Sequence, residues 1–345
     1  MLYTTTRGKH DVETAYKAIH NDCHTDGGLF VPFRMPTFSK VRVDALAIMS
    51  PAQIISEILN KLFSCGLTSL DVEHALGRKP VTTRSIGRYL MTVELWHNVG
   101  SEMNWVVQRL SDRLCGGTRR TVPSNWMHVA VRIALLMASY GQLLSAGSVP
   151  ARQLLDVAVT SGDFAMPMAV WYARQMGLPI GNIICGCNAN GGIWDLLNRG
   201  EFSTGDLFSH TCTPKVDIVV PRNLERLICA TLGVEETLRY LQCCSKGRSY
   251  IISEEAKALL GHGLFAAVIS DSRVESIVPG VWQTSGHVLS PYGALAYGSL
   301  QDYWSMTGHT RPALLIEERS PKLDSKYVSA LLHVDENDLR GIVEQ

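Results

Sequence analysis

The stretch LDVAVTSGDFAMPMAVWYARQMGLPIGNIICGC, residues Leu155–Cys187, predicts one strand–helix–strand unit. Leu155–Thr160 and Ile180–Cys187 are short apolar runs bounded by turn residues, which is typical of buried strands. Between them, Met168–Met176 has a helical pattern that Gly177-Leu178-Pro179 ends. Because consecutive parallel strands need such a crossover, the stretch predicts a parallel sheet covered by helices.

The same alternation extends along the chain in both directions. Further strands are predicted at Leu90–Trp96, Val216–Val220 and Phe265–Ser270. Further helices are predicted at Met103–Leu114, from a Pro123-Ser124 cap through a long amphipathic helix to about Leu144, and at Gly192–Arg199, Asn223–Leu232 and Pro291–Thr307. The sequence therefore predicts an α/β fold with a mainly parallel sheet.

The N-terminal quarter has a different pattern. It contains helical stretches at Val12–Ile19, Pro51–Cys65 and Ser69–Leu76, and a turn at Asp26-Gly27-Gly28 before Leu29–Pro32. We therefore predict two domains, an N-terminal domain at residues 1–91 and a larger α/β domain at residues 92–345.

Composition argues against several classes of protein. Hydrophobic residues make up 46% of the chain and charged residues 19%, with 32 basic and 32 acidic side chains. This balance predicts a large core and no nucleic-acid partner, which would need concentrated positive charge. The apolar run Val129–Leu144 contains Arg132 and is shorter than the about 20 residues that span a bilayer, so we interpret it as a buried helix. With no apolar signal-peptide core at the N-terminus, we expect a cytoplasmic protein without a membrane partner.

Metal-binding motifs are absent from the sequence. The nine cysteines include no C-x2-C pair, and the eleven histidines include no H-E-x-x-H motif. Zinc sites usually show such spacings, so no metal site is predicted.

The N-terminal region contains, in this order, Tyr3, Thr6-Arg7-Gly8, the DGGLFVP stretch Asp26–Pro32, and Met35-Pro36. Together with the segments that follow, this pattern resembles threonine synthase, a pyridoxal-phosphate enzyme of fold type II. Later matches are Glu94–His97 (family ELFHGPT), Ser124-Asn125-Trp126 (NSINW), Tyr172–Ile180 (the helix and its MGLPI turn), Asn188-Ala189-Asn190 (TNEND), Val216–Ile218 with Pro221–Leu227 (MDI…PSNFERL) and Ser290–Ala294 (DPHTA). The resemblance covers most of the chain and implies a threonine-synthase-like, tryptophan synthase β-like fold.

The resemblance also implies where the reactive lysine should stand. The family carries it in HGPTLAFKD, where its amine forms a Schiff base with the cofactor. Here the stretch begins at His97, and Asn104 stands at the lysine position. An amide forms no Schiff base, so His97 and Asn104 are predicted to be vestigial. Other lysines that could replace it are Lys79, Lys215, Lys246, Lys257 and Lys322, for each of which a surface position is the simpler interpretation.

The phosphate loop that the resemblance implies has also changed. The family reads TGNFG, and this chain reads Ser161-Gly162-Asp163-Phe164-Ala165. Small residues let backbone N–H groups close on a phosphate. Asp163 adds negative charge there and Ala165 replaces the second glycine, so an ordinary strand-to-helix turn is the favoured interpretation.

Two further parts of the family's site are reduced. Only about twenty residues, Trp105–Ser124, occupy the interval in which the family has a small substrate-binding domain, and a strand–helix–strand unit alone needs about 30 residues. In the DPHTA segment, Tyr292 and Gly293 replace the histidine and threonine, so a hydroxyl partner for the cofactor ring is lost, although Ser290 is nearby in sequence.

These changes favour a non-catalytic homologue, a pseudoenzyme that acts as a binding or interaction module. No cofactor is expected, or pyridoxal phosphate if the family's site is retained. We expect a homo-oligomer or a dedicated protein partner, and a small amino-acid or phosphorylated ligand is possible. The alternative is a pyridoxal-phosphate-dependent lyase or other small-metabolite enzyme, with Asp163, His97, Glu94 and Glu102 as available acid–base groups.

Overall fold

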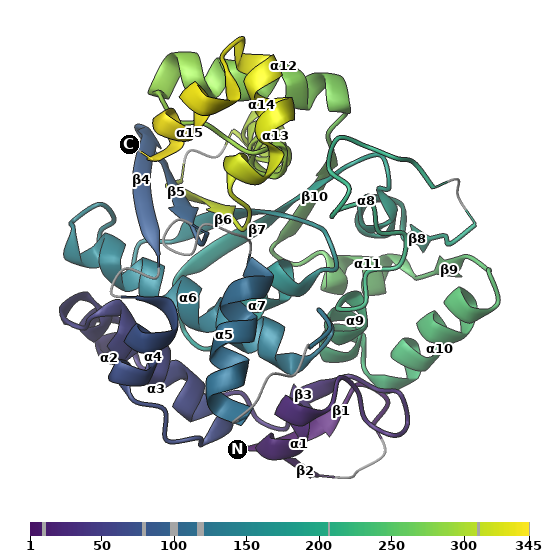
Figure 1. Cartoon of the computed structure of the whole chain (residues 1–345). Helices are drawn as coiled ribbons and strands as arrows, with labels where there is room; N and C mark the ends of the chain where they lie inside the picture. Colours follow the sequence, from purple (N-terminus) through teal and green to yellow (C-terminus); the bar gives the residue numbers. More distant parts are fainter. Residues whose placement is uncertain are drawn as a thin grey trace.

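A six-stranded sheet forms the centre of the chain in the computed structural model (Figure 1). The strand order is β10-β7-β6-β11-β5-β4. The strands span Thr82–Gly87 (β4), Leu90–Glu94 (β5), Leu155–Thr160 (β6), Ile180–Cys187 (β7), Leu264–Val268 (β10) and Ala313–Glu317 (β11). All neighbours pair in parallel except β4, which is antiparallel to β5. The prediction of a mainly parallel sheet is confirmed.

The structure describes residues 1–8, 12–77, 81–96, 103–115, 121–205, 208–308 and 311–344. Within these ranges the predicted unit is present as β6, helix α7 (Ala165–Gln175) and β7. The sequence did not predict β4 or β11, although β11 lies between β5 and β6 in the sheet.

Helices cover both faces of this sheet. Helices α12 (Asp271–Ser285), α13 (Pro291–Thr307), α14 (Ser325–Leu332) and α15 (Glu336–Glu344) lie on one side (Figure 1). Helices α5 (Met103–Cys115), α6 (Trp126–Ser145) and α7 lie on the other. Strand residues alternate between the two cores: Ala158 packs with the α12–α15 layer and Val157 with the α6–α7 layer. The sheet is therefore buried on both faces, as an all-helix cover requires.

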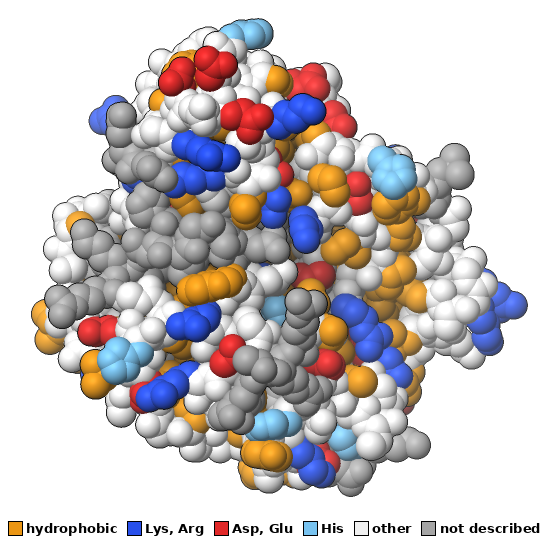
Figure 2. Space-filling view, viewed as in Figure 1, with side chains coloured by type: hydrophobic (Ala, Val, Ile, Leu, Met, Phe, Trp, Pro, Cys, Tyr) orange, Lys and Arg blue, Asp and Glu red, His pale blue; other side chains and the backbone are white. Residues whose placement is uncertain are grey.

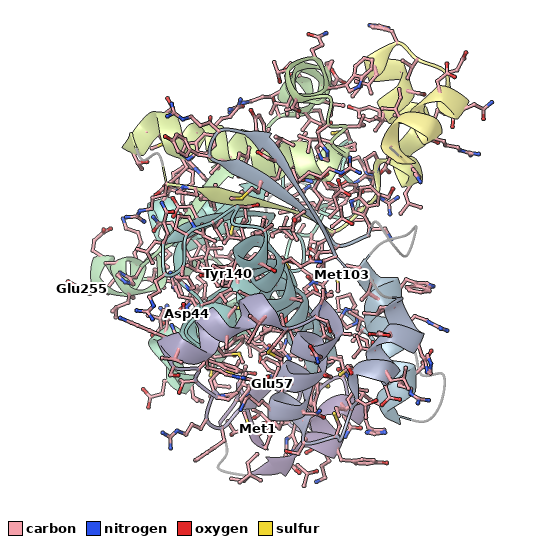
Figure 3. All side chains as sticks on the ribbon, turned by 90° about the vertical axis from the view of Figure 1, so that its left-hand side faces the viewer. Met1, Asp44, Glu57, Met103, Tyr140 and Glu255 are labelled. Atoms are coloured by element: carbon pink, nitrogen blue, oxygen red, sulfur yellow. The ribbon has the colours of Figure 1, made fainter. Side chains whose placement is uncertain are left out.

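Helix α6 is the central helix of the core. It has 20 residues, which is long enough to span a membrane, but 89% of its most apolar window is buried inside the protein. The predicted amphipathic pattern is wrong, because side chains are buried around its whole circumference, including the interior Tyr140 labelled in Figure 3. Asn125, not Ser124, caps the helix by accepting the Met127 N–H at 2.8 Å.

The N-terminal region packs against α6. It contains strands β1 (Leu2–Thr5), β2 (Glu13–Thr14) and β3 (Phe30–Pro32), helices α1 (Ala15–His20), α2 (Lys40–Asp44), α3 (Pro51–Phe63) and α4 (Ser69–Leu76), and the 3-10 turn η1 (Ala45–Ile48). The buried Tyr3 hydroxyl donates to the Leu62 carbonyl at 2.6 Å and accepts the Trp126 indole N–H at 3.0 Å. Such fully satisfied buried groups fix one arrangement of the two regions.

A buried arginine makes the second link between these regions. Arg226 is fully buried and donates to the carbonyls of Phe30 at 3.1 Å and Ser124 at 2.9 Å, and to the Asn223 side chain. Its guanidinium also lies over the Trp126 ring, 5.5 Å from the centroid.

The predicted domain boundary, between residues 91 and 92, falls inside β5, and the β4–β5 pair belongs to the six-stranded sheet.

The segments between β7 and β10 form α8 (Gly192–Arg199), β8 (Glu201–Phe202), α9 (Leu224–Leu232), α10 (Val234–Ser245), β9 (Tyr250–Ile251) and α11 (Glu254–Leu260). The 3-10 turn η2 (Pro321–Asp324) follows β11 and packs on α14 and α15. The strand predicted at Val216–Val220 is wrong. That segment is a turn, with the Val216 N–H donating to the Thr213 carbonyl at 2.8 Å.

Candidate functional site

A cleft with a volume of about 380 Å³ opens where β6 and β11 end. The carboxyl ends of parallel strands are the usual ligand-binding edge of such sheets. Residues of the β6–α7 turn (Thr160, Gly162, Asp163), of α5 (Met103, Asn104), of the 214–218 loop, of the α13 start and of the β11 end line it. The structure therefore brings three of the seven predicted vestigial positions, Asn104, Gly162 and Asp163, into one site.

Asn104 lies in the first turn of α5 and lines the cleft. An exposed amide there supplies no amine to form an imine with a carbonyl group. His97, the other predicted vestigial position, lies outside the described residues, as does Glu102.

The β6–α7 turn carries the clearest departure from a phosphate cradle. Gly162 and Phe164 both have positive φ, +42° and +68°, so the backbone turns sharply into α7. The Asp163 carboxylate accepts the Ala165 N–H at 3.0 Å and the Asn223 amide at 3.1 Å. The Asp163 carboxylate thus already accepts the Ala165 N–H, a donor at the start of α7 that a phosphate would need. Burial raises the pKa of Asp163, and the nearby Arg132 charge opposes that shift.

The remaining predicted loop positions are structural. Ser161 is buried and its N–H donates to the Gly186 carbonyl at 2.9 Å, which joins the turn to β7. Phe164 and Ala165 are buried in the core under α7. The favoured interpretation of an ordinary strand-to-helix turn is consistent with these contacts.

A polar network holds the loop that brings Lys215 into the cleft. The Asp217 carboxylate accepts from the Asn188 amide at 2.7 Å, from the Thr211 hydroxyl at 2.6 Å and from the Thr211 N–H at 3.1 Å. These bonds fold residues 211–217 into a turn, which is the physical reason why no strand forms there. Lys215 is exposed, as predicted, and it also lines the cleft, which sequence reasoning did not anticipate.

Two arginines complete the charged lining. The buried Arg132 contacts Glu318 with its Nε 2.6 Å from Oε1. Arg319 contacts Asp324 at 2.9 Å, and its guanidinium lies 5.5 Å from the Tyr292 ring centroid. Charges of both signs are likewise interspersed over the protein face in Figure 2.

The segment 290–293 begins α13 at the cleft. Ser290 is fully buried, and its hydroxyl caps α13 by accepting the Gly293 N–H at 3.1 Å. Tyr292 accepts the Lys215 backbone N–H at 3.4 Å. Ser290 is therefore a helix cap and is not among the residues that line the cleft.

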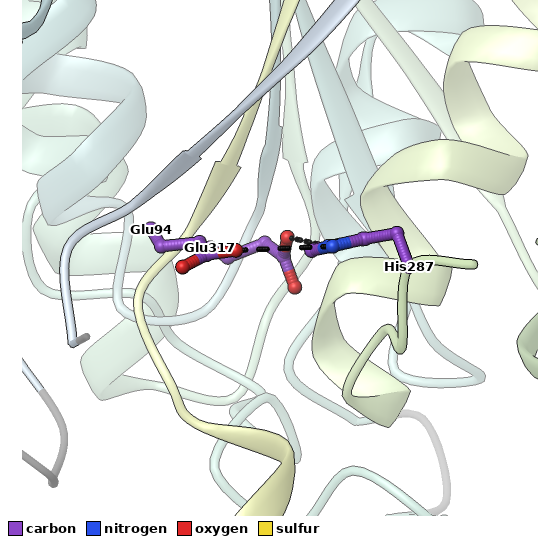
Figure 4. A group of neighbouring side chains, drawn as sticks. All are labelled: Glu94, His287 and Glu317. Carbon is purple, nitrogen blue, oxygen red and sulfur yellow. Dashed lines mark hydrogen bonds and ion pairs between the residues drawn. The ribbon is translucent and has the colours of Figure 1, made fainter. Parts of the chain in front are cut away.

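Behind the cleft wall lies a buried cluster of Glu94, His287 and Glu317 (Figure 4). The two glutamates end β5 and β11 and are paired in register. The His287 Nε2 atom lies 2.7 Å from Glu317 Oε1, its Nδ1 atom lies 3.8 Å from Glu94 Oε1, and Arg84 Nε lies 3.0 Å from Glu94 Oε1. Three potential metal-ligand atoms lie within 4.8 Å of one another, where the sequence predicted no metal site.

Proximity perturbs the pKa values of this cluster. Burial, followed by repulsion from Glu317, raises the pKa of Glu94 to about 7. Burial disfavours the charged imidazole, but the attraction and hydrogen bond of Glu317 together with the charge of Glu94 outweigh burial and raise the pKa of His287. Glu94 was predicted as an acid–base group of the cleft, but it lies in this cluster and is not a lining residue. His287 and Glu317 were not predicted as site residues. The local signal that could have indicated Glu317 is the charged run Glu317-Glu318-Arg319 after Ile316.

Comparisons with known proteins give relatives for part of the chain. Residues 2–77 match the family description "Threonine synthase N terminus". "Threonine synthase-like 1" of Pongo abelii is 25% identical over 175 residues, which is 50% of this chain and 24% of that protein. "Threonine synthase-like 2" of Homo sapiens is 25% identical over 174 residues, which is 50% of this chain and 36% of that protein. The matched region thus spans about a quarter to a third of these relatives.

Solved structures establish the fold. The pyridoxal-phosphate-bound threonine synthase of Brucella melitensis superposes with a TM-score of 0.85 at 17% identity, covering 100% of this chain and 95% of that one. Threonine synthase from yeast superposes with a TM-score of 0.81 at 15% identity, covering 97% of this chain and 90% of that one. The fold class predicted from sequence is confirmed.

Proposed function

We propose that this chain does not catalyse the reaction of threonine synthase and instead binds a small ligand in the cleft. The chain has the fold of threonine synthase and the N-terminal region of that family. The observation that carries the proposal is the pair of residues in the cleft wall, Asn104 and Asp163. Asn104 offers no amine at the position that the resemblance assigns to the Schiff-base lysine. The Asp163 carboxylate occupies the Ala165 N–H at the start of α7.

Pyridoxal phosphate does not fit these residues well. Its aldehyde needs an amine and its phosphate needs free donors, while the Asp163 carboxylate of the β6–α7 turn already accepts the Ala165 N–H and the Asn223 amide. Beyond this turn, the cleft retains three basic side chains, those of Arg132, Lys215 and Arg319.

The chemistry of the lining favours a carboxylate ligand such as an amino acid. Arginine and lysine supply charged donors to a carboxylate, and Asp163 or Glu318 would accept from an ammonium group. The cleft volume, about 380 Å³, lies within the usual range for small-molecule sites.

Ligand binding is tested by melting temperature and calorimetry with a panel of amino acids, with O-phosphoserine as the phosphorylated member. We expect a carboxylate ligand to stabilise the wild type and to bind Lys215→Met at least tenfold more weakly. Lys246→Met, an exposed lysine at the end of α10, is the matched control and should bind normally. Equal binding by all three proteins would place the ligand outside the cleft. No binding by the wild type would contradict the proposed ligand-binding function.

One observation favours a second function, a pyridoxal-phosphate-dependent lyase or other small-metabolite enzyme. Lys215 brings an amine into the cleft from a different loop. If this amine reacts with pyridoxal phosphate, borohydride reduction will fix a covalent adduct on Lys215, and Lys215→Met will lose it. That outcome would replace the binding-module proposal.

We also propose that the protein forms a homo-oligomer or has a dedicated protein partner. Trp105 on α5 and Val122 before α6 are 39% and 45% exposed, and they lie in the shortened interval where the family has its small domain. Exposed apolar side chains of this kind are commonly covered by association. Light scattering tests self-association, and a monodisperse monomer with no partner in a pulldown would contradict the proposal.

A further inference from the structure

Three buried donors come together from separate elements. Glu94 ends β5, Glu317 ends β11 and His287 lies between α12 and α13. Each is at most 8% exposed, and one potential ligand atom from each lies within 4.8 Å of the others (Figure 4). None of the three is needed for ligand binding in the cleft.

Within the described part of the chain, Glu317 Oε2 and Thr92 Oγ1 are buried on this side of the sheet without a hydrogen-bond partner. Glu317 Oε1 contacts His287. Thr92 lies two residues before Glu94 on the same face of β5. Buried polar atoms are nearly always satisfied, so such orphans point to a bound ion or water.

The missing side chain of Gly293 leaves room beside the orphan carboxylate oxygen. A methyl group at position 293 would lie 3.0 Å from Glu317 Oε2. Because Gly293 also lines the cleft, the carboxylate lies directly behind the cleft wall. Glycine at position 293 therefore leaves Oε2 uncovered on the side that faces the cleft wall.

We propose that Glu94, His287 and Glu317 bind one divalent transition-metal ion, of which Zn²⁺ is representative. The two carboxylates outweigh the single charge of Arg84, and Zn²⁺ accepts imidazole nitrogen and carboxylate oxygen together. With bonds of about 2.1 Å, two donors on one ion lie at most about 4.2 Å apart. The three ligand atoms lie within 4.8 Å of one another, so they exceed that limit by at most about 0.6 Å. Arg84 Nε contacts Glu94 Oε1 at 3.0 Å.

The test measures metal content directly. The protein is stripped with a chelator, loaded with Zn²⁺ or Co²⁺, desalted and analysed for metal, and the Co²⁺ form is scanned for visible ligand-field bands. We expect about one equivalent in the wild type and at least a tenfold loss of affinity in Glu317→Gln and His287→Gln. Gly293→Ala should also weaken binding at least tenfold, because its methyl fills the space beside Oε2 while all three donors remain.

Glu225→Gln is the matched control, since Glu225 is an equally buried glutamate in another ion pair. It should retain one equivalent, which separates loss of a ligand from general destabilisation. Circular dichroism establishes that each variant is folded. Less than a tenth of an equivalent in the wild type, or equal binding by wild type and Glu317→Gln, would overturn the proposal and leave the cluster as an internal ion network.

Discussion

Replacing Asp163 with alanine should open an anion site at the start of α7. The Asp163 carboxylate accepts the Ala165 N–H at 3.0 Å, so a phosphate oxygen using that donor would approach the carboxylate to about 4 Å. At an effective dielectric constant of about 20, two unit charges at that distance repel by about 4 kcal/mol, which is about 1,000-fold in affinity. Loss of the two hydrogen bonds of Asp163 should itself lower the free energy of unfolding by about 1–2 kcal/mol.

The assay is the melting temperature in phosphate against chloride at equal ionic strength. If Asp163→Ala binds phosphate with a Kd of about 1 mM, then 50 mM phosphate adds about 2 kcal/mol to its stability. For a chain of this length that is a rise of about 3 °C, and the wild type should show almost none. Asp195→Ala, which removes an aspartate from the first turn of α8, is the control and should not gain a phosphate response. If Asp163→Ala responds no more than the wild type, Asp163 is not what blocks the phosphate position.

Three further substitutions test the packing that positions the cleft. Tyr3→Phe leaves the buried Trp126 N–H without its acceptor and should lower the free energy of unfolding in urea by about 2 kcal/mol, whereas a loss under about 0.5 kcal/mol would contradict that role. Arg226→Met leaves the Phe30 and Ser124 carbonyls unpaired and should lower the free energy of unfolding by about 3–5 kcal/mol. The loss should appear as a lower melting temperature and a lower soluble yield. An unchanged melting temperature would refute the role of Arg226 in joining the two regions. Burial, with repulsion from the neighbouring Arg132, lowers the pKa of His128 to about 3. The neutral imidazole is therefore favoured in the folded protein, and its contribution to the free energy of unfolding is present above the unfolded pKa of about 6.5 and is lost as the pH falls toward 3. His128→Gln should flatten the loss of stability between pH 6.5 and pH 4, which is about 3 kcal/mol for this group, and an unchanged pH profile would contradict the buried neutral state.

Much of the α/β organisation could be predicted because local signals agreed with the final structure. The β6–α7–β7 unit has apolar strands, a helical stretch and a Gly-Leu-Pro stop in one run, and each element forms close to its predicted place. Strand β11 was missed although it is central, because a four-residue apolar run, Ala313–Ile316, carries no period that separates a strand from a helix segment. The wrong strand at Val216–Val220 has a different cause, since tertiary hydrogen bonds to Asp217 override its apolar pattern.

The candidate site was predictable only where the family resemblance marked a position. Asn104, Gly162 and Asp163 were anticipated and line the cleft together. Lys215 and Arg132 were not assigned to it, because a lysine in a loop and an arginine in an apolar helix give no local sign of a shared cleft. The Glu94–His287–Glu317 cluster depends on β5 and β11 being neighbours, and that pairing joins segments more than 200 residues apart.

The central proposal, that the family's cofactor chemistry is absent, is tested most directly by adding pyridoxal phosphate to the purified protein. Absorbance is recorded before and after borohydride reduction, followed by intact mass and peptide mapping. We predict no aldimine band from the cleft and no adduct on Lys215, with the same result in Lys215→Met. A stoichiometric adduct on Lys215 that disappears in Lys215→Met would contradict the proposal and show that a second lysine has replaced the missing one.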